Sequence, residues 1–354
     1  MSIQDVVMQQ QIKQSFVKQL LIVSLILCSS FSLLAANHSD NDVVKALEED
    51  NIALANELFA GFNESQKKSL SGQILKSRIL FREGKTEESY EILAQLSEKN
   101  KDHADIYYYF GRSAIVMAQK VSIFSKLSYA SDALEAWQHA LVLNPKHIET
   151  LEGIIGFHIG APSIAGGDIE QALSYSQILI TLDPEKGYAN LAKVYWQKEQ
   201  ADLAEKAIAE GLTMVPNSGQ LYFTQGIAYS HQAKDDNQFW EKARVTLNKA
   251  VVNSKSNKEK QHALYQLGKI AVNSGEEIQA GIDALEQLLT LESKQYKQWG
   301  KYRLAELYLN NKQLTKANEF IALINYEEDD NLEDKVKTLA KKIKKAIKKQ
   351  SKAS

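Results

Sequence analysis

Three of the four prolines in this chain close the same kind of short phrase, in which two residues at the end of a helical stretch precede the proline. These prolines are Pro145, Pro184 and Pro216, so the phrase returns after 39 and then 32 residues. A helical phrase that stops at a proline and recurs every 30 to 40 residues or so is typical of a helical repeat array. Such an array predicts an extended concave surface that holds other molecules, and not a single buried active-site core.

The clearest unit of the array is 185–218. Its first helical stretch places a small residue among large ones, and its second stretch has an alanine followed four residues later by an isoleucine. Small residues let two helices approach closely, while the large residues fill the space between them. The positions concerned are Tyr188, Leu191, Ala192, Tyr195, Ala204, Ile208 and Pro216.

This pattern resembles the tetratricopeptide repeat (TPR) motif, which reads W-x2-L-G-x2-Y, then A-x3-F, then P. Tyr188 and Ile208 replace the Trp and Phe of the family, and Gly211 stands where a second alanine is usual. The same pattern recurs in neighbouring segments, with extra residues near 119–128 and 235–239. The resemblance therefore covers 70–331 as an array. It implies an all-α, TPR-type right-handed superhelix (α-solenoid) of about seven helix pairs, which we expect to form one continuous domain.

The first 36 residues differ from the array. Lys13 and Lys18 precede an apolar run from Leu20 to Leu27, and small residues follow up to Ala36. This order predicts a secretory signal peptide, cleaved after Ala36 or Ser32, and hence a periplasmic or other extracytoplasmic protein. The alternative is an uncleaved inner-membrane anchor formed by residues 20–36, although this run is at the short limit for a spanning helix.

The cysteine content excludes cysteine-dependent sites from the exported chain. Cys28 is the only cysteine and would leave with the signal peptide. The mature chain would then have neither disulfides nor cysteine-based zinc sites. Residues 37–69 follow, and their apolar spacing predicts N-terminal helices that pack on the start of the array.

The C-terminal segment, 332–354, predicts an amphipathic helix. Acidic residues precede nine lysines, and apolar residues recur at helical spacing at Leu332, Val336, Leu339, Ile343 and Ile347. The apolar stripe is expected to cap the exposed face of the last repeat, as repeat arrays require. The alternative is docking of the lysines on an anionic membrane surface or an acidic partner, which we expect to be at most a weak contact. Nucleic acid is not expected, because no aromatic residues interleave the lysines.

One segment, 156–168, departs from the repeat pattern. We expect it to be an elaborate turn in which Asp168 caps the following helix. The alternative is a small anionic ligand bound to free backbone N–H groups at Gly166, Gly167 and Asp168, beside His158. The carboxylate of Asp168 argues against that ligand because it would compete for the same donors.

No catalytic signature accompanies the repeats. Gly84-Lys85-Thr86 resembles the end of a phosphate-binding loop, but Ile79 occupies the position of the required earlier glycine. The seven histidines show no zinc-protease spacing, and no nucleophile elbow occurs. We therefore expect a non-catalytic protein with no metal and no cofactor.

The resemblance to TPR proteins implies that the first helix of each unit lines a groove for a protein or peptide partner. Aromatic and basic side chains on those helices are the expected anchors. For each aromatic residue the alternative is ordinary packing between repeats. The candidate groove residues are Tyr108, Arg112, Lys193, Trp196, Phe223, His231, Tyr265, Lys269, Trp299 and Tyr302.

Overall fold

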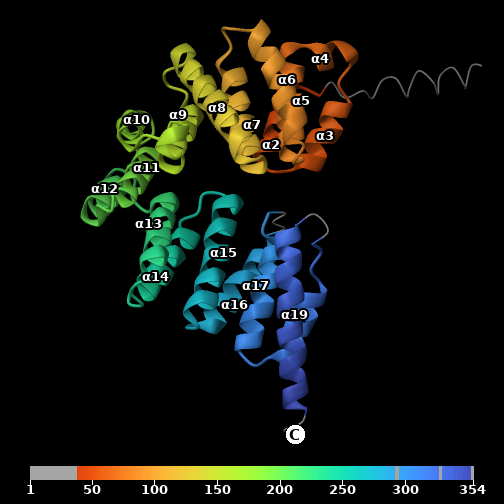
Figure 1. Cartoon of the computed structure of the whole chain (residues 1–354), viewed down its shortest axis with the longest axis vertical. Helices are drawn as coiled ribbons and strands as arrows, with labels where there is room; N and C mark the ends of the chain where they lie inside the picture. Colours follow the sequence, from red (N-terminus) through yellow and green to blue (C-terminus); the bar gives the residue numbers. More distant parts are fainter. Residues whose placement is uncertain (1–37, 292–294, 327–328, 352–354) are drawn as a thin grey trace, which may run out of the picture. The chain divides into compact units, whose positions relative to one another are not determined.

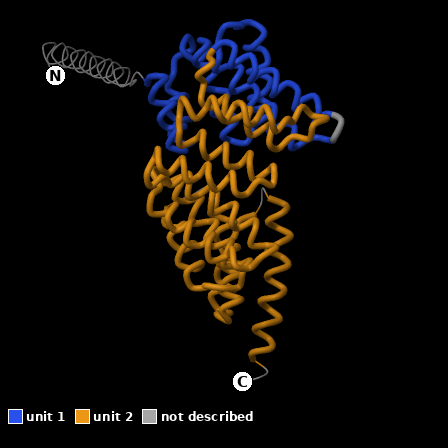
Figure 2. Tube along the Cα trace, turned by 90° about the vertical axis from the view of Figure 1, so that its left-hand side faces the viewer, with its two compact units in different colours: residues 1–143 blue, residues 144–354 orange. Residues whose placement is uncertain are grey.

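The structure is a computed structural model that describes residues 38–291, 295–326 and 329–351. These residues form eighteen α-helices and one short 3₁₀ turn, with no strand among them. The chain divides into two compact units, residues 1–143 and 144–354, which Figure 2 colours separately. The predicted signal peptide, residues 1–36, lies outside the described residues.

Unit 1 begins with short helices that pack against the first repeat. Val43, Ala55 and Phe62 share one apolar cluster with Leu75 and Ile79 of the first repeat helix, as predicted for the N-terminal helices. Two helix pairs, α5/α6 and α7/α8, complete the unit (Figure 1). The helices are α2 (Asp40–Glu48), α3 (Ile52–Ala60), α4 (Glu64–Lys68), α5 (Leu70–Arg82), α6 (Thr86–Lys99), α7 (Ala104–Lys120) and α8 (Ile123–Leu143).

The pair α7/α8 shows how close the two helices of a repeat approach. A side chain at Gly111 of α7 would start 2.7 Å from the indole nitrogen of Trp137 in α8, so only glycine fits at this crossing. The same indole nitrogen donates a hydrogen bond to the carbonyl oxygen of Tyr108 at 3.1 Å. The extra residues near 119–128 lengthen both helices, and the turn between them is short.

Unit 2 contains five further helix pairs and a terminal helix. From the second of these pairs on, the first helix of each pair packs against both helices of the pair before it (Figure 1). The elements are α9 (Ile148–Gly160), η1 (Ser163–Ala165), α10 (Ile169–Leu182), α11 (Pro184–Gln197), α12 (Ala201–Met214), α13 (Gly219–Gln232), α14 (Phe239–Val252), α15 (Asn257–Ser274), α16 (Ile278–Thr290), α17 (Lys297–Asn310), α18 (Leu314–Ala322) and α19 (Asp330–Gln350). With the two pairs of unit 1, the described residues contain the seven helix pairs that the repeats predicted.

The recurrent proline marks the boundary between repeats for a local reason. Pro184 is the first residue of α11, where its missing N–H has no helical partner to lose. Asp183 just before it caps the helix, because its carboxylate accepts from the backbone N–H of Lys186 at 3.1 Å. Pro145 and Pro216 stand just ahead of α9 and α13. The repeated phrase therefore ends one repeat and starts the first helix of the next.

The terminal helix α19 closes unit 2 as predicted. Leu332, Val336, Leu339 and Ile343 are buried in the same apolar cluster as residues of α17 and α18. Ile347, one turn further on, is 38% exposed. The helix therefore uses four turns of its apolar stripe to cover the last repeat, and its final turns extend past that contact.

The segment 156–168 forms a shorter loop than the sequence predicted. Helix α9 continues through Gly160, so only 161–168 leave the helical path. Gly166 turns the chain at a φ of 92°, and Asp168 caps α10 by accepting from the N–H groups of Glu170 and Gln171. The predicted cap is confirmed, and the predicted loop start at Gly156 is wrong. Glycines 156 and 160 remained helical because α9 packs against α10 and α11.

Among the helices of the described residues, none combines the length and the apolar character that crossing a membrane requires.

Candidate binding groove

Unit 2 contains a cleft of about 930 Å³ that runs across several repeats. The first helices of four successive pairs, α9, α11, α13 and α15, supply most of its wall, and we call it the α9–α15 cleft. A cleft between repeats, and not within one, is the surface that stacked helix pairs create on their first-helix side.

Helix α13 contributes one continuous face to the cleft. Gln220, Phe223, Ile227 and His231 follow one another at intervals of three or four residues, which brings them onto one side of a helix. Phe223 is half-buried because its ring also packs against the apolar cluster of the C-terminal repeats. The helix begins at the cap formed by Ser218, whose hydroxyl accepts from the N–H of Leu221 at 3.0 Å.

Helix α11 places Lys193 and Trp196 on the neighbouring wall, one turn apart. The Lys193 side chain is exposed, yet protein surrounds it on the cleft wall and limits the water that can solvate its ammonium group. This restricted hydration lowers the pKa of Lys193, and the charge of Glu152 offsets the effect only in part. An ammonium group in this position can bind a negatively charged oxygen or a carbonyl oxygen of a ligand.

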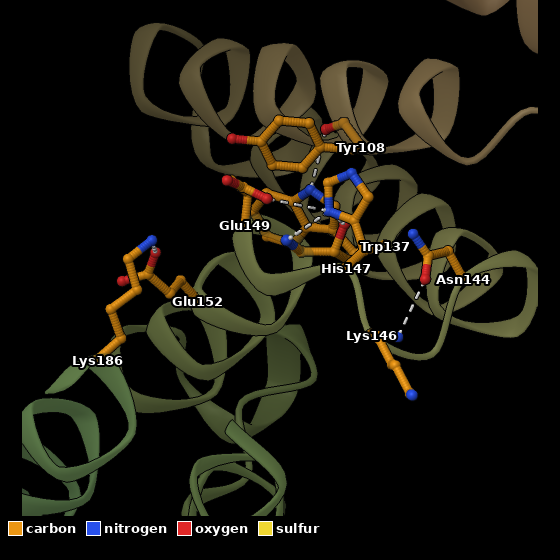
Figure 3. A network of polar contacts seen from close by, with 9 residues as sticks. Tyr108, Trp137, Asn144, Lys146, His147, Glu149, Glu152 and Lys186 are labelled. Atoms are coloured by element: carbon orange, nitrogen blue, oxygen red, sulfur yellow. Dashed lines mark hydrogen bonds and ion pairs between the residues drawn. The ribbon is translucent and has the colours of Figure 1, made fainter. Parts of the chain in front are cut away.

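Glu152 does not neutralise Lys193 because another lysine engages it. Lys186 Nζ donates to Glu152 Oε2 at 2.8 Å and joins α11 to α9 (Figure 3). Burial works to lower the pKa of Lys186, but the hydrogen bond and charge of Glu152 outweigh it and raise that pKa. Figure 3 also shows the start of α9, where His147 Nδ1 accepts from the N–H of Thr150 at 3.2 Å. This end of the cleft is thus held by polar contacts within unit 2.

A second polar tie joins three repeats at their N-terminal ends. Glu185 at the start of α11 accepts from Ser218 Oγ and from Lys255 Nζ, each at 2.5 Å. Burial works to raise the pKa of Glu185, but these two donors outweigh it and lower that pKa. The tie fixes the relative register of α11, α13 and the segment before α15, and so the width of the cleft.

The cleft carries charges of both signs. Lys193 and Lys258 line it together with Glu152, Glu199 and Glu259. His231 stands at the far end of α13, where burial together with Lys234 and Lys269 lowers its pKa. A surface with both signs and several apolar side chains suits a polypeptide better than a uniformly charged polymer.

Two ring nitrogens in the cleft wall have no hydrogen-bond partner within the part of the chain that the structure describes. They are Trp196 Nε1 and His262 Nε2. A buried polar nitrogen without a partner costs roughly 1–3 kcal/mol. Both rings belong to residues that line the cleft.

Four of the ten predicted groove residues line the α9–α15 cleft, namely Lys193, Trp196, Phe223 and His231. Tyr265 and Lys269 lie on α15 but do not line it. The ring of Tyr265 stacks on Tyr296 with centroids 4.6 Å apart. Burial, Arg303 and Lys234 lower the pKa of Lys269. These two residues continue the same face of α15 toward α17.

The remaining predicted residues have packing contacts of their own. Trp299 Nε1 donates to Asp329 Oδ2 at 2.9 Å, which ties α17 to the residue that caps α19. Tyr302 is buried in the core of unit 2 and donates to Glu306. For Tyr302 the structure therefore favours the packing alternative over the groove. Its position in α17 is covered by helices on both sides, which a sequence motif does not register.

Tyr108 and Arg112 belong to α7 in unit 1 and do not line this cleft. The Tyr108 ring contacts Tyr109 with centroids 4.8 Å apart. The Arg112 guanidinium stacks over the ring of Phe81 at 4.6 Å. The guanidinium thus contacts an aromatic ring of the preceding repeat within unit 1.

Several residues that line the cleft were absent from the prediction, among them Gln220, Ile227 and His262. The signal that could have found them is helical spacing. Gln220 lies three residues before Phe223, and Ile227 lies four residues after it. His262 lies three residues before Tyr265. Selecting only aromatic and basic residues excluded Gln220 and Ile227 by type, although they share the face.

At the alternative anion site, the N–H groups of Gly166 and Gly167 already donate to the carbonyl oxygens of Ser163 and Pro162, at 3.0 and 3.1 Å. The Asp168 carboxylate itself accepts from the N–H groups of Glu170 and Gln171 at 2.9 and 3.2 Å. His158 is 6% exposed, and its Nδ1 lies 3.2 Å from the Gly166 carbonyl oxygen. Burial lowers the pKa of His158. These groups serve the loop's own folding.

Within the described ranges, no group of three or more His, Cys, Asp or Glu side chains is placed to hold a metal ion.

Comparison with known proteins gives similarity in structure only. No family model matches the chain, and no curated protein matches it in sequence. The human IFIT1 dimer with m7Gppp-AAAA superimposes with a TM-score of 0.51 at 16% identity, covering 86% of this chain and 71% of that chain. A tetratricopeptide repeat protein from Parabacteroides merdae gives a TM-score of 0.49 at 14% identity, over 75% of this chain and 96% of that one.

A thermophilic TPR protein from Thermus thermophilus is also similar, with a TM-score of 0.46 at 15% identity over 52% of this chain and 94% of that chain. At such identities the similarity concerns the fold. In its fold, the chain is an all-α solenoid of helix pairs that resembles tetratricopeptide repeat proteins.

Proposed function

We propose that the protein is a non-catalytic scaffold whose α9–α15 cleft binds an extended segment of a partner protein. The observation that carries this proposal is the cleft itself, about 930 Å³ across four first helices and lined by four residues expected to anchor a peptide. Its wall combines aromatic, aliphatic, cationic and amide groups, the mixture found at protein interfaces.

The dimensions of the cleft fit a short stretch of extended chain. Neighbouring packed helices lie about 8–10 Å apart, so four successive first helices span roughly 27 Å. An extended polypeptide rises about 3.3 Å per residue, which corresponds to about eight residues along the cleft. A small molecule would occupy only part of this length.

The charges of the cleft favour a polypeptide over nucleic acid. The human IFIT1 structure is described with m7Gppp-AAAA, a capped RNA. In this chain Glu152, Glu199 and Glu259 line the cleft and would repel phosphates. A peptide can donate backbone N–H groups to these carboxylates and offer carbonyl oxygens to Lys193. The negative and the positive side chains of the cleft would then both have hydrogen-bond partners.

Random-peptide display against the whole protein tests this proposal. Selected peptides are titrated against the double variant Lys193→Ala, Phe223→Ala and against a matched control, Lys206→Ala, Val245→Ala. The control residues are exposed on the second helices α12 and α14. We expect the cleft variant to lose at least about thirtyfold in affinity, because central aromatic and cationic anchors dominate such interfaces.

The control variant should bind within about twofold of the wild type, a change that is small on the free-energy scale of binding. Helicity and thermal melting of both variants establish that they are folded. Equal losses in the two variants, or binding that neither variant changes, would contradict the cleft as the binding site. Displacement of the peptides by RNA but not by other peptides would assign the cleft to nucleic acid.

We further propose that the protein is exported, with residues 1–36 serving as a cleaved signal peptide. A positive lead, a short apolar stretch and small residues before Ala36 support this proposal. Mass spectrometry of the protein purified from its native cells should find a chain that begins near residue 37. An intact Met1 end in a membrane fraction would instead establish the anchor alternative.

A further inference from the structure

The second half of α19 carries a dense and unpaired positive charge. Between 340 and 350 there are six lysines and no acidic residue: Lys341, Lys342, Lys344, Lys345, Lys348 and Lys349. All six are exposed. Within the described residues the ion pair of this helix joins Lys337 to Glu333, and none of the six lysines forms one.

The six lysines lie on the side of α19 that faces away from the last repeat. At 3.6 residues per turn, each residue advances the helix by about 100°, which places the six within an arc of about 160°. The buried residues Leu332, Val336, Leu339 and Ile343 centre on the opposite side. Capping the repeat array therefore leaves this lysine face fully available, so the two roles do not compete.

The acidic residues of the helix are too far along its axis to cancel this charge. Asp330 and Asp334 share the same side but belong to the first two turns. At 1.5 Å per residue along the axis, Asp334 lies about 10 Å from Lys341, the nearest of the six, and about 16 Å from Lys345. The Debye length at physiological ionic strength is about 8 Å, so the repulsion from these carboxylates is largely screened at the lysine face.

We propose that the lysine face of α19 docks the protein on the surface of an anionic phospholipid bilayer. The observation that carries this proposal is a set of six exposed ammonium groups within one arc of about 160°, with no apolar side chain among them, on a helix whose earlier turns pack on the last repeat. Contact is by adsorption to headgroup phosphates. The apolar residues of α19 stay against the last repeat.

Because the face consists of lysines alone, an anionic bilayer fits it better than other anionic partners. Ammonium groups act as point charges, and the face offers neither the planar guanidinium groups nor the aromatic rings that read single phosphates or bases. Clusters of four to eight basic residues on a helix suit a diffuse field of anionic headgroups.

Vesicle co-sedimentation of the whole protein tests the proposal. Binding is compared on phosphatidylcholine vesicles with and without about 30% phosphatidylglycerol, at about 0.1 M salt. The readout is the ratio of the two partition coefficients, because an apolar N-terminal segment would act on both kinds of vesicle. We expect the anionic vesicles to bind at least about a hundredfold more tightly, since each lysine contributes about fivefold.

Three variants isolate the face. Replacing the six lysines by glutamine should bring the ratio close to one, and replacing them by arginine should preserve it. The matched control replaces six exposed lysines elsewhere, Lys76, Lys99, Lys101, Lys126, Lys146 and Lys297, by glutamine. This control changes the net charge by the same amount. The logarithm of its partition ratio should stay at least about half that of the wild type, because charges off the docking face add little.

Several results would overturn the proposal. They are equal binding to neutral and anionic vesicles, selectivity that survives the six glutamines, and an equal loss in the control variant. Binding of the wild type that does not fall between about 0.1 and 0.5 M salt would also exclude an electrostatic contact, and needs no variant. Preference for duplex DNA over vesicles of equal charge would assign the face to nucleic acid.

Discussion

Helices α11 and α19 both bury one apolar side in unit 2, but they differ in how many neighbours surround them. Helix α11 packs against α9, α10, α12 and α13, whereas the main helical neighbours of α19 in the described part of the chain are α17 and α18. Small residues such as Gly187, Ala189 and Ala192 are therefore among the buried residues of α11, beside larger ones such as Leu191 and Val194. Helix α19 instead presents Leu332, Val336, Leu339 and Ile343 to a single partner surface.

The difference extends to the charged residues of the two helices. Lys193 of α11 stands in the wall of a cleft, and limited hydration lowers its pKa. The lysines of α19 stand on an open face of the molecule. In the two proposals above, lysine would provide a local contact for a peptide in the cleft and a broad electrostatic surface on α19. The number of neighbouring helices decides which role a lysine can serve.

The strongest test of this crowding is Gly187→Ala. A Cβ at Gly187 would lie 2.4 Å from the backbone of Ile180 in α10, which cannot move without shifting the helix. We expect a loss of at least about 3 kcal/mol in the free energy of unfolding. Urea denaturation followed by circular dichroism measures it.

The matched control is Gly156→Ala in α9, where nothing lies within 4 Å of the added carbon. This change should stabilise the protein by about 0.5–1 kcal/mol, because alanine favours the helix. Similar effects of the two substitutions would show that α11 is less tightly enclosed than its contacts indicate.

The second test concerns the single contact surface of α19. Ile343 is fully buried, and Ile343→Ala should cost about 2 kcal/mol, the low end for such a cavity, since the end of an array can relax. Because α19 has neighbours on one side only, we expect local opening of the helix before the repeats unfold. Amide hydrogen exchange should become faster in α19 and stay unchanged in α11.

The control for this test is Ile347→Ala, one turn further along the same stripe and 38% exposed. It should change the stability by no more than about 0.5 kcal/mol. Faster exchange throughout unit 2 in the Ile343 variant would mean that the cap and the repeats unfold as one cooperative body.

A third test compares the carboxylate of Glu185, whose side chain is 16% exposed, with that of Glu333, whose side chain is 35% exposed. The pKa of Glu185 is lowered below its usual 4.5 because the hydrogen bonds from Lys255 and Ser218 outweigh burial. The ionised Glu185 therefore contributes to the free energy of unfolding above about pH 4.5, and this contribution is lost as the pH falls through the lowered pKa. Glu185→Gln should cost about 1 kcal/mol at neutral pH and progressively less in acid.

Glu333→Gln serves as the control, since Glu333 of α19 pairs with an exposed Lys337. We expect a cost below about 0.5 kcal/mol for an exposed pair of this kind. Denaturation curves at a series of pH values measure both variants. A pH-independent difference between Glu185→Gln and the wild type would exclude the proposed ionic role.

The smallest expected effect is that of Lys193→Met. Because restricted hydration lowers the folded-state pKa of Lys193 below 10.5, the unfolded chain binds more protons in alkaline solution. The contribution of Lys193 to the free energy of unfolding therefore rises with pH between its lowered pKa and about 10.5. The variant should be more stable at neutral pH by less than about 1 kcal/mol, and this advantage should shrink as the pH rises.

Lys344→Met on the open face of α19 should give no such gain. Urea denaturation at neutral and alkaline pH compares the two variants. An equal gain at both positions would mean that the cleft does not restrict the hydration of Lys193.

Part of the candidate site could be predicted from the resemblance to TPR repeats, whose first helices line a groove. Lys193, Trp196, Phe223 and His231 were predicted on the correct helices and line the cleft. The prediction did not separate these residues from Tyr302, which is buried, because both kinds occupy similar positions in their repeats. What distinguishes them is coverage by later helices, and α19 covers the last repeats.

The sequence by itself determined the repeats, the helix boundaries near the prolines and the capping role of α19. These features depend on local rules, such as proline at a helix start and apolar residues at a helical period, which act within a few residues. Only the tertiary structure decided the extent of the cleft and the engagement of Glu152 by Lys186. Those outcomes depend on contacts between residues more than thirty positions apart, or on which helices enclose a side chain, and no local pattern encodes either.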